Sequence, residues 1–298
     1  MPKPLPPRVA EQRKKIVDAV IDSLNNNDLT WLQEWSAGTA PQNYVSGNAY
    51  RGLNRLNLLF ASRANGFTDP RFITFKQAQE HGWKVRKGER SFAVEKWKSY
   101  VIPPLDEDHE ARVCIACVGY YSVFNLQQVD GAPSFEPDLP DLTPNSITRI
   151  ADRLIATSRC DVKETTEGRA CYQPAYDRIL VPDRRLFIGD DTTRSQNFVR
   201  TLCHELGHST MVPLSRPHQD YAREELVAEL TALFTCGDLG LQVSYDEGDL
   251  HFRQHAAYLK SWASGLKDKP QALFTAAALA DKASAYILDR YNHVSKDT

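Results

Sequence analysis

Two histidines and a glutamate stand in the pattern His204-Glu205-Leu206-Gly207-His208. On a helix, residues four apart lie one turn apart on the same face, so both imidazoles can reach one metal ion. The glutamate after the first histidine then lies beside the open coordination position, where it can accept a proton from a bound water. The spacing therefore predicts a metal site with His204 and His208 as ligands and Glu205 as general base.

A tetrahedral site needs a third protein ligand, and the run Glu224–Glu229 offers candidates. Glu225 and Glu229 are four apart and can both face the motif helix. Their order resembles that of the gluzincin clan, in which the first acid binds zinc and the second orients a ligand histidine, and this similarity favours Glu225. The apolar residues around Glu229 make it the more buried of the two, which favours Glu229 instead. We expect Glu225 to bind the metal, Glu229 to lie behind a histidine and Glu224 to be solvated.

Other histidines offer weaker alternatives. His218 could complete a three-histidine site, but its loop lacks the glycine and third histidine at the offsets that a metzincin requires. His251 and His255 are four apart without an acid between them, so we expect a surface pair. The metal is expected to be Zn²⁺ or another divalent ion such as Mn²⁺.

The motif must be held by a buried helix, and apolar residues at Phe198, Leu202 and Leu206 predict one over about 193–210. Gly207 would let a neighbouring backbone approach it closely. The next helix is expected from about residue 220 past 234, and the tail over 250–291 is predicted to be helical. Residues 161–188 predict a hairpin, with 177–188 as an edge strand beside the metal, and Ser146 is expected to cap the helix that precedes it.

The first half has its own helices and strands. Apolar spacing predicts helices over 9–26 and 52–64, and Thr74 is expected to cap a short helix that ends at His81. Residues 83–124 favour strands, joined across the acidic run Asp106–Glu110. Cys114 and Cys117 lie in an apolar run that predicts a buried strand with structural thiols, because no second Cys pair is present to complete a zinc ribbon.

A segment with four prolines and no basic residue, 130–145, predicts a linker. We therefore expect an α+β protein of two domains, 1–129 and 146–298. The composition, 42% hydrophobic and 25% charged, is that of a globular chain. No apolar run approaches the roughly 20 residues that span a bilayer, and the proline-rich start has no signal-peptide core. The six cysteines are expected to be reduced in a cytoplasmic protein without a membrane partner.

Positive charge is concentrated in one stretch. Residues 51–98 hold eleven Lys and Arg against four Asp and Glu, although the whole chain carries only −2. Basic and aromatic side chains alternate there, a mixture that can bind the phosphates and unstacked bases of a single strand. The alternative is that the aromatics are core residues and the charges form a solvated surface. The candidate DNA-binding residues are Arg51, Arg55, Lys76, Trp83, Lys84, Arg86, Lys87, Arg90, Lys96, Trp97 and Lys98.

Several motifs of the first half resemble the N-terminal domain of ArdC-type antirestriction proteins of conjugative plasmids, which is shared with TraC-type primases. They are Trp31 and Trp35 after the first helix, Tyr50–Asn54, Asp69–Phe72, Thr74–Ala78 and Gly82–Glu89. The second half resembles the zincin-like metallopeptidase domain of the same proteins through His204–His208 and Glu224–Glu229. One departure is Ser209-Thr210-Met211, where the family commonly has a Trp-Thr-Gly-like segment; it alters the wall of the cleft and leaves the metal ligands in place.

The resemblance implies single-stranded DNA binding by the first domain, a zincin-like (gluzincin-type) metalloprotease fold in the second, and protection of incoming plasmid DNA from restriction. Protection could come from coating the DNA or from cleavage of a protein such as a restriction-enzyme subunit. Two other functions stay open: a zinc peptidase whose first domain docks protein, and a DNA-binding module whose metal is structural.

Overall fold

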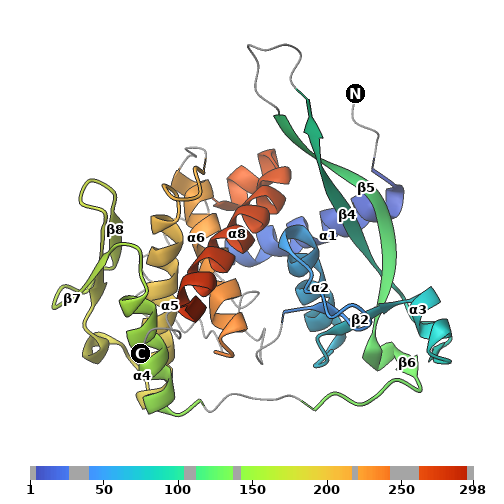
Figure 1. Cartoon of the computed structure of the whole chain (residues 1–298), viewed down its shortest axis with the longest axis horizontal. Helices are drawn as coiled ribbons and strands as arrows, with labels where there is room; N and C mark the ends of the chain where they lie inside the picture. Colours follow the sequence, from blue (N-terminus) through green and yellow to red (C-terminus); the bar gives the residue numbers. More distant parts are fainter. Residues whose placement is uncertain are drawn as a thin grey trace.

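The computed structural model describes residues 5–26, 40–103, 112–136, 142–216, 221–241 and 262–293. Helices and sheets occur in both halves (Figure 1), which confirms the predicted α+β class. The helices are α1 (Pro7–Asn25), α2 (Gly52–Asn65), α3 (Phe75–Glu80), α4 (Pro144–Ala156), α5 (Asp191–Ser209), α6 (Tyr221–Asp238), one over 262–268 and α8 (Gln271–His293). The strands are β1 (Gln42–Asn43), β2 (Arg71–Thr74), β3 (Lys84–Val85), β4 (Phe92–Ile102), β5 (Arg112–Asn125), β6 (Val129–Asp130), β7 (Asp161–Thr165), β8 (Cys171–Gln173) and β9 (Arg178–Pro182). None of the described helices is long and apolar enough to cross a membrane.

The helices expected in the first half are confirmed as α1, α2 and α3. The Thr74 hydroxyl accepts a hydrogen bond from the Gln77 amide at 3.2 Å, and the Gln77 side chain accepts one from the Thr74 amide at 3.0 Å, so the two residues cap α3 reciprocally. The helix expected to begin at Ser146 instead begins at Pro144, with Thr143 as its N-cap. Proline suits this position because its fixed φ fits the first turn, where an N–H would have no helical partner.

The larger sheet has the strand order β1-β2-β5-β4 and is antiparallel except for the β1–β2 pair. Neighbouring residues of β2 point to opposite faces. Phe72 packs with Leu58 of α2 on one face, and Ile73 packs with Ala78 of α3 on the other. Each face of the sheet therefore has its own small core, covered by a different helix.

The β4–β5 hairpin extends past this sheet, away from the helices (Figure 1). Strand β5 pairs with β2 only over residues 123–125 but with β4 over 112–123, so the outer ribbon (96–102 with 112–121) pairs with no third strand among the described residues. The expectation of a buried strand around Cys117 is therefore wrong for the side chains that can be described. Val118 is 42% exposed, and the Cys117 thiol is only half-buried.

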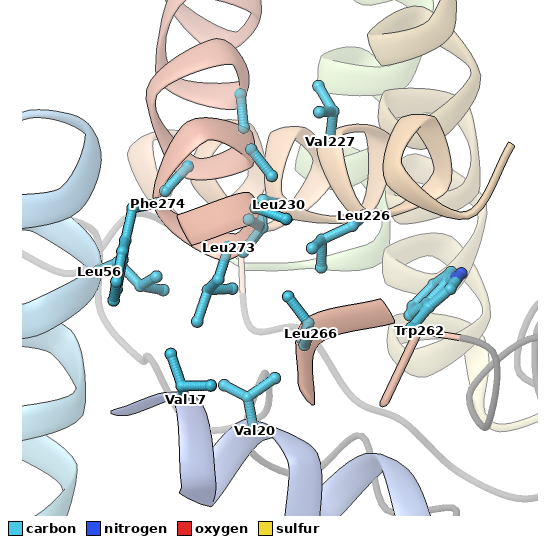
Figure 2. Close-up of a cluster of buried hydrophobic side chains, with 14 of the residues drawn as sticks. Val17, Val20, Leu56, Leu226, Val227, Leu230, Trp262, Leu266, Leu273 and Phe274 are labelled. Atoms are coloured by element: carbon cyan, nitrogen blue, oxygen red, sulfur yellow. The ribbon is translucent and has the colours of Figure 1, made fainter. Parts of the chain in front are cut away.

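The largest hydrophobic cluster joins the two halves of the sequence. Val17 and Val20 of α1 and Leu56 of α2 pack with Leu230 of α6 and Leu273 of α8 (Figure 2). Helices α1 and α2 thus pack on helices that follow the linker expected at 130–145. The two halves therefore share this largest cluster.

Helix α2 approaches α8 closely at its first residue. Gly52 has a φ of +51°, and a Cβ there would lie 3.3 Å from the Ala278 Cα. Both the positive φ and the short distance require glycine. Three residues later, the buried Arg55 guanidinium donates to Asp238 of α6 at 2.8 and 3.0 Å and to the Phe234 carbonyl at 3.0 Å.

Arg55→Ala should lower the free energy of unfolding by about 3–5 kcal/mol, because it leaves the half-buried Asp238 and the buried Asp281, 3.8 Å away, without their charged partner. The measurement is urea unfolding followed by circular dichroism. Arg51→Ala is the control: its side chain is 61% exposed and lies 3.9 Å from Asp281, so its loss should cost less than about 1 kcal/mol. Equal costs for the two variants would contradict the assigned role of Arg55.

Candidate metal centre and nucleic-acid interface

Helix α5 carries the His204–His208 motif and is buried along most of its length. The Asp190 side chain accepts a hydrogen bond from the Thr193 amide at 2.7 Å and caps its N-terminus. Phe198, Leu202 and Leu206 are at most 3% exposed, as their spacing predicted. His204 is fully buried, so its ring is held by packing as well as by its polar partners.

Gly207 sets the distance between α5 and α6. A Cβ on it would lie 3.1 Å from the Thr231 Cβ and 3.2 Å from the Ala228 Cα, tighter than ordinary side-chain packing. The expected close approach at Gly207 is therefore confirmed. A larger residue would push α6 away and withdraw its carboxylates from the motif histidines.

Three side chains converge between the two helices. The Nε2 atoms of His204 and His208 are 3.1 Å apart, and the two Glu225 oxygens lie 3.4 Å from one Nε2 atom each. These three residues offer ligand atoms that all lie within 4.8 Å of one another. Ligands about 2.0–2.2 Å from a tetrahedral zinc ion lie roughly 3.4 Å apart, so the set fits one metal ion.

Glu229 lies behind the first histidine. Its Oε2 is 3.0 Å from the His204 Nδ1, the ring nitrogen that faces away from the other ligands, and it is 1% exposed. A carboxylate in this position fixes the orientation and tautomer of a ligand histidine. Both Glu225 oxygens thus face the Nε2 atoms, while Glu229 lies behind the His204 ring.

Acidic neighbours dominate the electrostatics of both imidazoles. Burial acts to lower the pKa of His204, but the hydrogen bonds and charges of Glu225 and Glu229 outweigh it and raise the pKa to about 10. For His208, burial is likewise outweighed by Glu224 and Glu225, and the pKa rises to about 9. The carboxylates around the two rings thus favour positive charge at this point.

Glu224 was expected to be solvated, and this expectation is wrong. It is 8% exposed, and its Oε1 lies 3.3 Å from the His208 Nδ1. The Arg216 guanidinium donates to both of its oxygens at 2.7 and 2.9 Å and to the Gly207 carbonyl at 2.9 Å. Each motif histidine therefore has its own carboxylate behind it. Sequence reasoning missed Arg216 because it lies in no helix or strand and has no fixed spacing to the motif.

Glu205 faces a cleft of about 600 Å³ that is lined by both histidines, by Glu225 and by strand β8. Its Oε2 accepts a hydrogen bond from the Tyr172 amide of β8 at 2.7 Å. The edge strand expected at 177–188 is instead β9, the central strand of the sheet β7-β9-β8. The error arose because β7 pairs with β9 in parallel, a pairing that a hairpin pattern does not reveal.

The candidate DNA-binding residues differ in exposure and lie on different helices, strands and loops. Arg55 is buried and ion-paired, so it is removed from the set. Trp83 is half-buried and stacks on His81 at 4.7 Å between ring centroids. Trp97 is 49% exposed, flanked by two exposed lysines on the ribbon. The other exposed candidates are Arg51, Lys76, Lys84, Arg86, Lys87 and Arg90.

Some sequence expectations fall outside the described residues. These are the alternative ligand His218, the pair His251 and His255, and the tryptophans Trp31 and Trp35.

Glu224→Gln should weaken Zn²⁺ or Mn²⁺ binding about 10–100-fold, because it removes the charge that orients the His208 ring. Calorimetric titration in the presence of a competing chelator measures the affinity. Glu167→Gln removes an exposed carboxylate of the same half and serves as the control. Wild-type affinity in Glu224→Gln would show that Glu224 does not position the ligand.

Comparison with known families matches two successive parts of the chain. Residues 10–124 match the N-terminal domain of anti-restriction factor ArdC, and residues 149–279 match the zincin-like metallopeptidase family. Two DNA primases TraC of Escherichia coli are each 32% identical to the chain over 92% of its length. The chain spans only 27% and 19% of the length of these primases. The protein y4eC of Sinorhizobium fredii is 31% identical, over 90% of this chain and 87% of that protein.

Solved structures give the same result. The metal-free structure of the antirestriction ArdC protein from plasmid R388 superposes with a TM-score of 0.72 at 30% identity and covers 94% of this chain and 97% of its own. The Mn(II)-bound structure of that protein has a TM-score of 0.68 at 29% identity, over 94% and 98% of the two chains.

Proposed function

Because the chain belongs to the ArdC family of antirestriction proteins, we propose that it binds single-stranded DNA through its first half and protects incoming plasmid DNA from restriction. The observation that carries the DNA-binding part is the outer β4–β5 ribbon. Lys96, Trp97 and Lys98 are exposed there in sequence, and the Lys96 ammonium lies 5.7 Å from the centre of the Tyr121 ring.

The ribbon presents the two groups that a single strand requires. Its lysines attract phosphates, and its exposed aromatic faces can stack on bases, which are unstacked only in single strands. Tyr100, Tyr120 and Tyr121 are 46%, 37% and 48% exposed, so the aromatics continue along both strands of the ribbon. A surface of this kind binds with little sequence preference, as protection of any incoming strand requires.

The second half is proposed to bind a divalent cation, Zn²⁺ or Mn²⁺, through His204, His208 and Glu225. The ligand distances and the Mn(II)-bound structure of the R388 protein support this. A cation held there would supply a Lewis acid for hydrolysis. Glu205, held by the Tyr172 amide at the cleft wall, is placed to accept a proton, while Glu224 and Glu229 orient the two histidines.

The metal centre could have either of two roles in protection, and the two roles differ in whether Glu205 is needed. If coating of DNA gives protection, the metal stabilises the packing of α5 on α6 and hydrolysis is dispensable. If cleavage of a protein gives protection, Glu205 is essential. We favour coating, because the exposed ribbon accounts for protection without a protein substrate.

The ribbon is tested by fluorescence anisotropy with a single-stranded oligonucleotide at about 50 and 200 mM salt. Trp97→Ala should cost about 1–3 kcal/mol of binding free energy through lost stacking. The double variant Lys96→Gln/Lys98→Gln should reduce the slope of log affinity against log salt by about 0.7 for each lost phosphate contact. The double variant Lys269→Gln/Lys282→Gln removes the same charge from exposed sites in the second half and serves as the control. Wild-type protein that does not bind, or binds equally at both salt concentrations, would refute the proposal.

The role of Glu205 is tested by Glu205→Gln, which keeps an oxygen for the Tyr172 amide but cannot serve as a base at neutral pH. We expect wild-type metal content and undiminished protection of plasmid DNA during transfer into a restricting recipient. Loss of protection with metal content and DNA affinity intact would instead establish hydrolysis as the mechanism.

A further inference from the structure

A second candidate surface lies at the base of the ribbon. A groove of about 570 Å³ opens between α1, the end of α2 and the start of β4. Its floor contains the apolar side chains Ile16, Phe60, Ala61 and Phe92, of which Ile16 and Ala61 are buried. Binding pockets for small molecules have volumes of about 300–1,000 Å³, so the groove can hold a flat ring system.

Cations line the rim of this groove. Arg8, Lys15 and Arg90 border it, and all three are exposed. The acids at the rim are already paired: Glu11 with Lys15 at 2.7 Å, and Glu89 with Arg86 at 2.9 Å. The rim therefore carries an excess of positive charge around an apolar floor.

Two of these cations have no carboxylate partner within the part of the chain that the structure describes. Arg8 donates to the hydroxyls of Ser91 at 2.6 Å and Ser122 at 3.2 Å and to the Ser91 carbonyl, all uncharged acceptors. Arg90 forms no ion pair within 4.0 Å among those residues, although its charge helps to lower the pKa of the Glu11 carboxyl at the same rim. By contrast, Arg13, Arg55, Arg71 and Arg86 of the same half are each bound by an aspartate or glutamate. The arginines available to an anionic ligand thus include two that flank the groove.

We infer that this groove seats one nucleotide of a single strand, with its base against the Phe60 and Phe92 floor and its phosphates on Arg8 and Arg90. This inference rests on the proposed DNA-binding function and names a second contact for the same strand. An apolar floor alone would suit any hydrophobic ligand, whereas two guanidinium groups without a carboxylate ion pair select one that also carries phosphate. Duplex DNA does not fit, because its bases are stacked and cannot enter a pocket.

The groove and the ribbon lie along one strand of the protein. Phe92 begins β4 and Lys98 lies six residues further along it, a separation of roughly 20 Å at the usual rise of a strand. One extended single strand can therefore contact both surfaces. The groove would fix one nucleotide while the ribbon stacks on its neighbours.

The test uses the full chain, a fluorescent single-stranded oligothymidine and anisotropy titrations at several salt concentrations. Arg8→Gln/Arg90→Gln should weaken binding about tenfold at low salt and reduce the salt slope by about 1.4, for two phosphate contacts. Arg149→Gln/Lys282→Gln removes the same charge from exposed positions of the second half and should change neither the affinity nor the slope by a comparable amount. Thermal unfolding of each variant shows whether the loss of the Arg8 contacts to Ser91 alters the fold.

A second variant blocks the groove without changing its charge. Ala64 lies at the rim in α2 and is exposed, so Ala64→Trp can fold and fill the space that the base would occupy. We expect it to weaken oligothymidine binding several-fold with an unchanged salt slope. If the wild type binds, the ribbon variants bind weakly, and both groove variants bind like the control, the groove inference is overturned while the proposed function stands. If the wild type does not bind single strands at all, both fail.

Discussion

The contact between α5 and α6 at Gly207 is the constraint on which the metal centre depends. The motif histidines project from α5, and the three glutamates that lie within 3.4 Å of their ring nitrogens in the described structure come from α6. Side chains of glutamate are short, so the helix axes must lie close together for three of them to reach two imidazoles. The absence of a Cβ at Gly207 permits that distance, and Arg216 further ties Glu224 to the Gly207 carbonyl.

Helix α6 also connects the centre to the rest of the molecule. Its first turns carry Glu224, Glu225 and Glu229, and its last turns provide the Phe234 carbonyl and Asp238 that bind Arg55 of α2. The same helix contributes to the core shared by α1, α2 and α8. An ion that holds α5 and α6 together would thereby also stabilise the surface on which the first half is packed, which gives a metal site a structural value even without hydrolysis.

The two ends of the edge strand β4 have different surroundings. At the base of β4, the Gln12 amide pairs with the free backbone of Ala93 at 2.9 and 3.0 Å, and the Asn54 amide does the same for Glu95 at 2.7 and 2.8 Å. These side chains occupy the edge and prevent strand addition there. Beyond Glu95, the described ribbon has neither such amides nor a packed helix, so its aromatic and basic side chains remain exposed. The same strand thus serves as part of the core at one end and as a candidate binding surface at the other.

The sequence by itself determined the local features of this protein. Helical periodicity located α1, α2, α5 and α6, the capping residues located α3, and the spacing of His204 and His208 placed both on one face of one helix. The short motifs of the first half and the His204–His208 motif of the second were also sufficient to predict the family and the α+β class. These features depend on residues a few positions apart, where backbone geometry alone relates sequence to space.

Only the tertiary structure decided how distant segments meet. Whether Glu225 or Glu229 faces both Nε2 atoms depends on the rotation and crossing of α6 against α5, which residue spacing within α6 cannot give. The burial of Glu224 required Arg216 from a loop, the burial of Arg55 required Asp238 from the other half, and the parallel β7–β9 pairing displaced the expected edge strand. In each case the partner is remote in sequence. The type of a charged or apolar side chain does not indicate which remote group will neutralise or cover it.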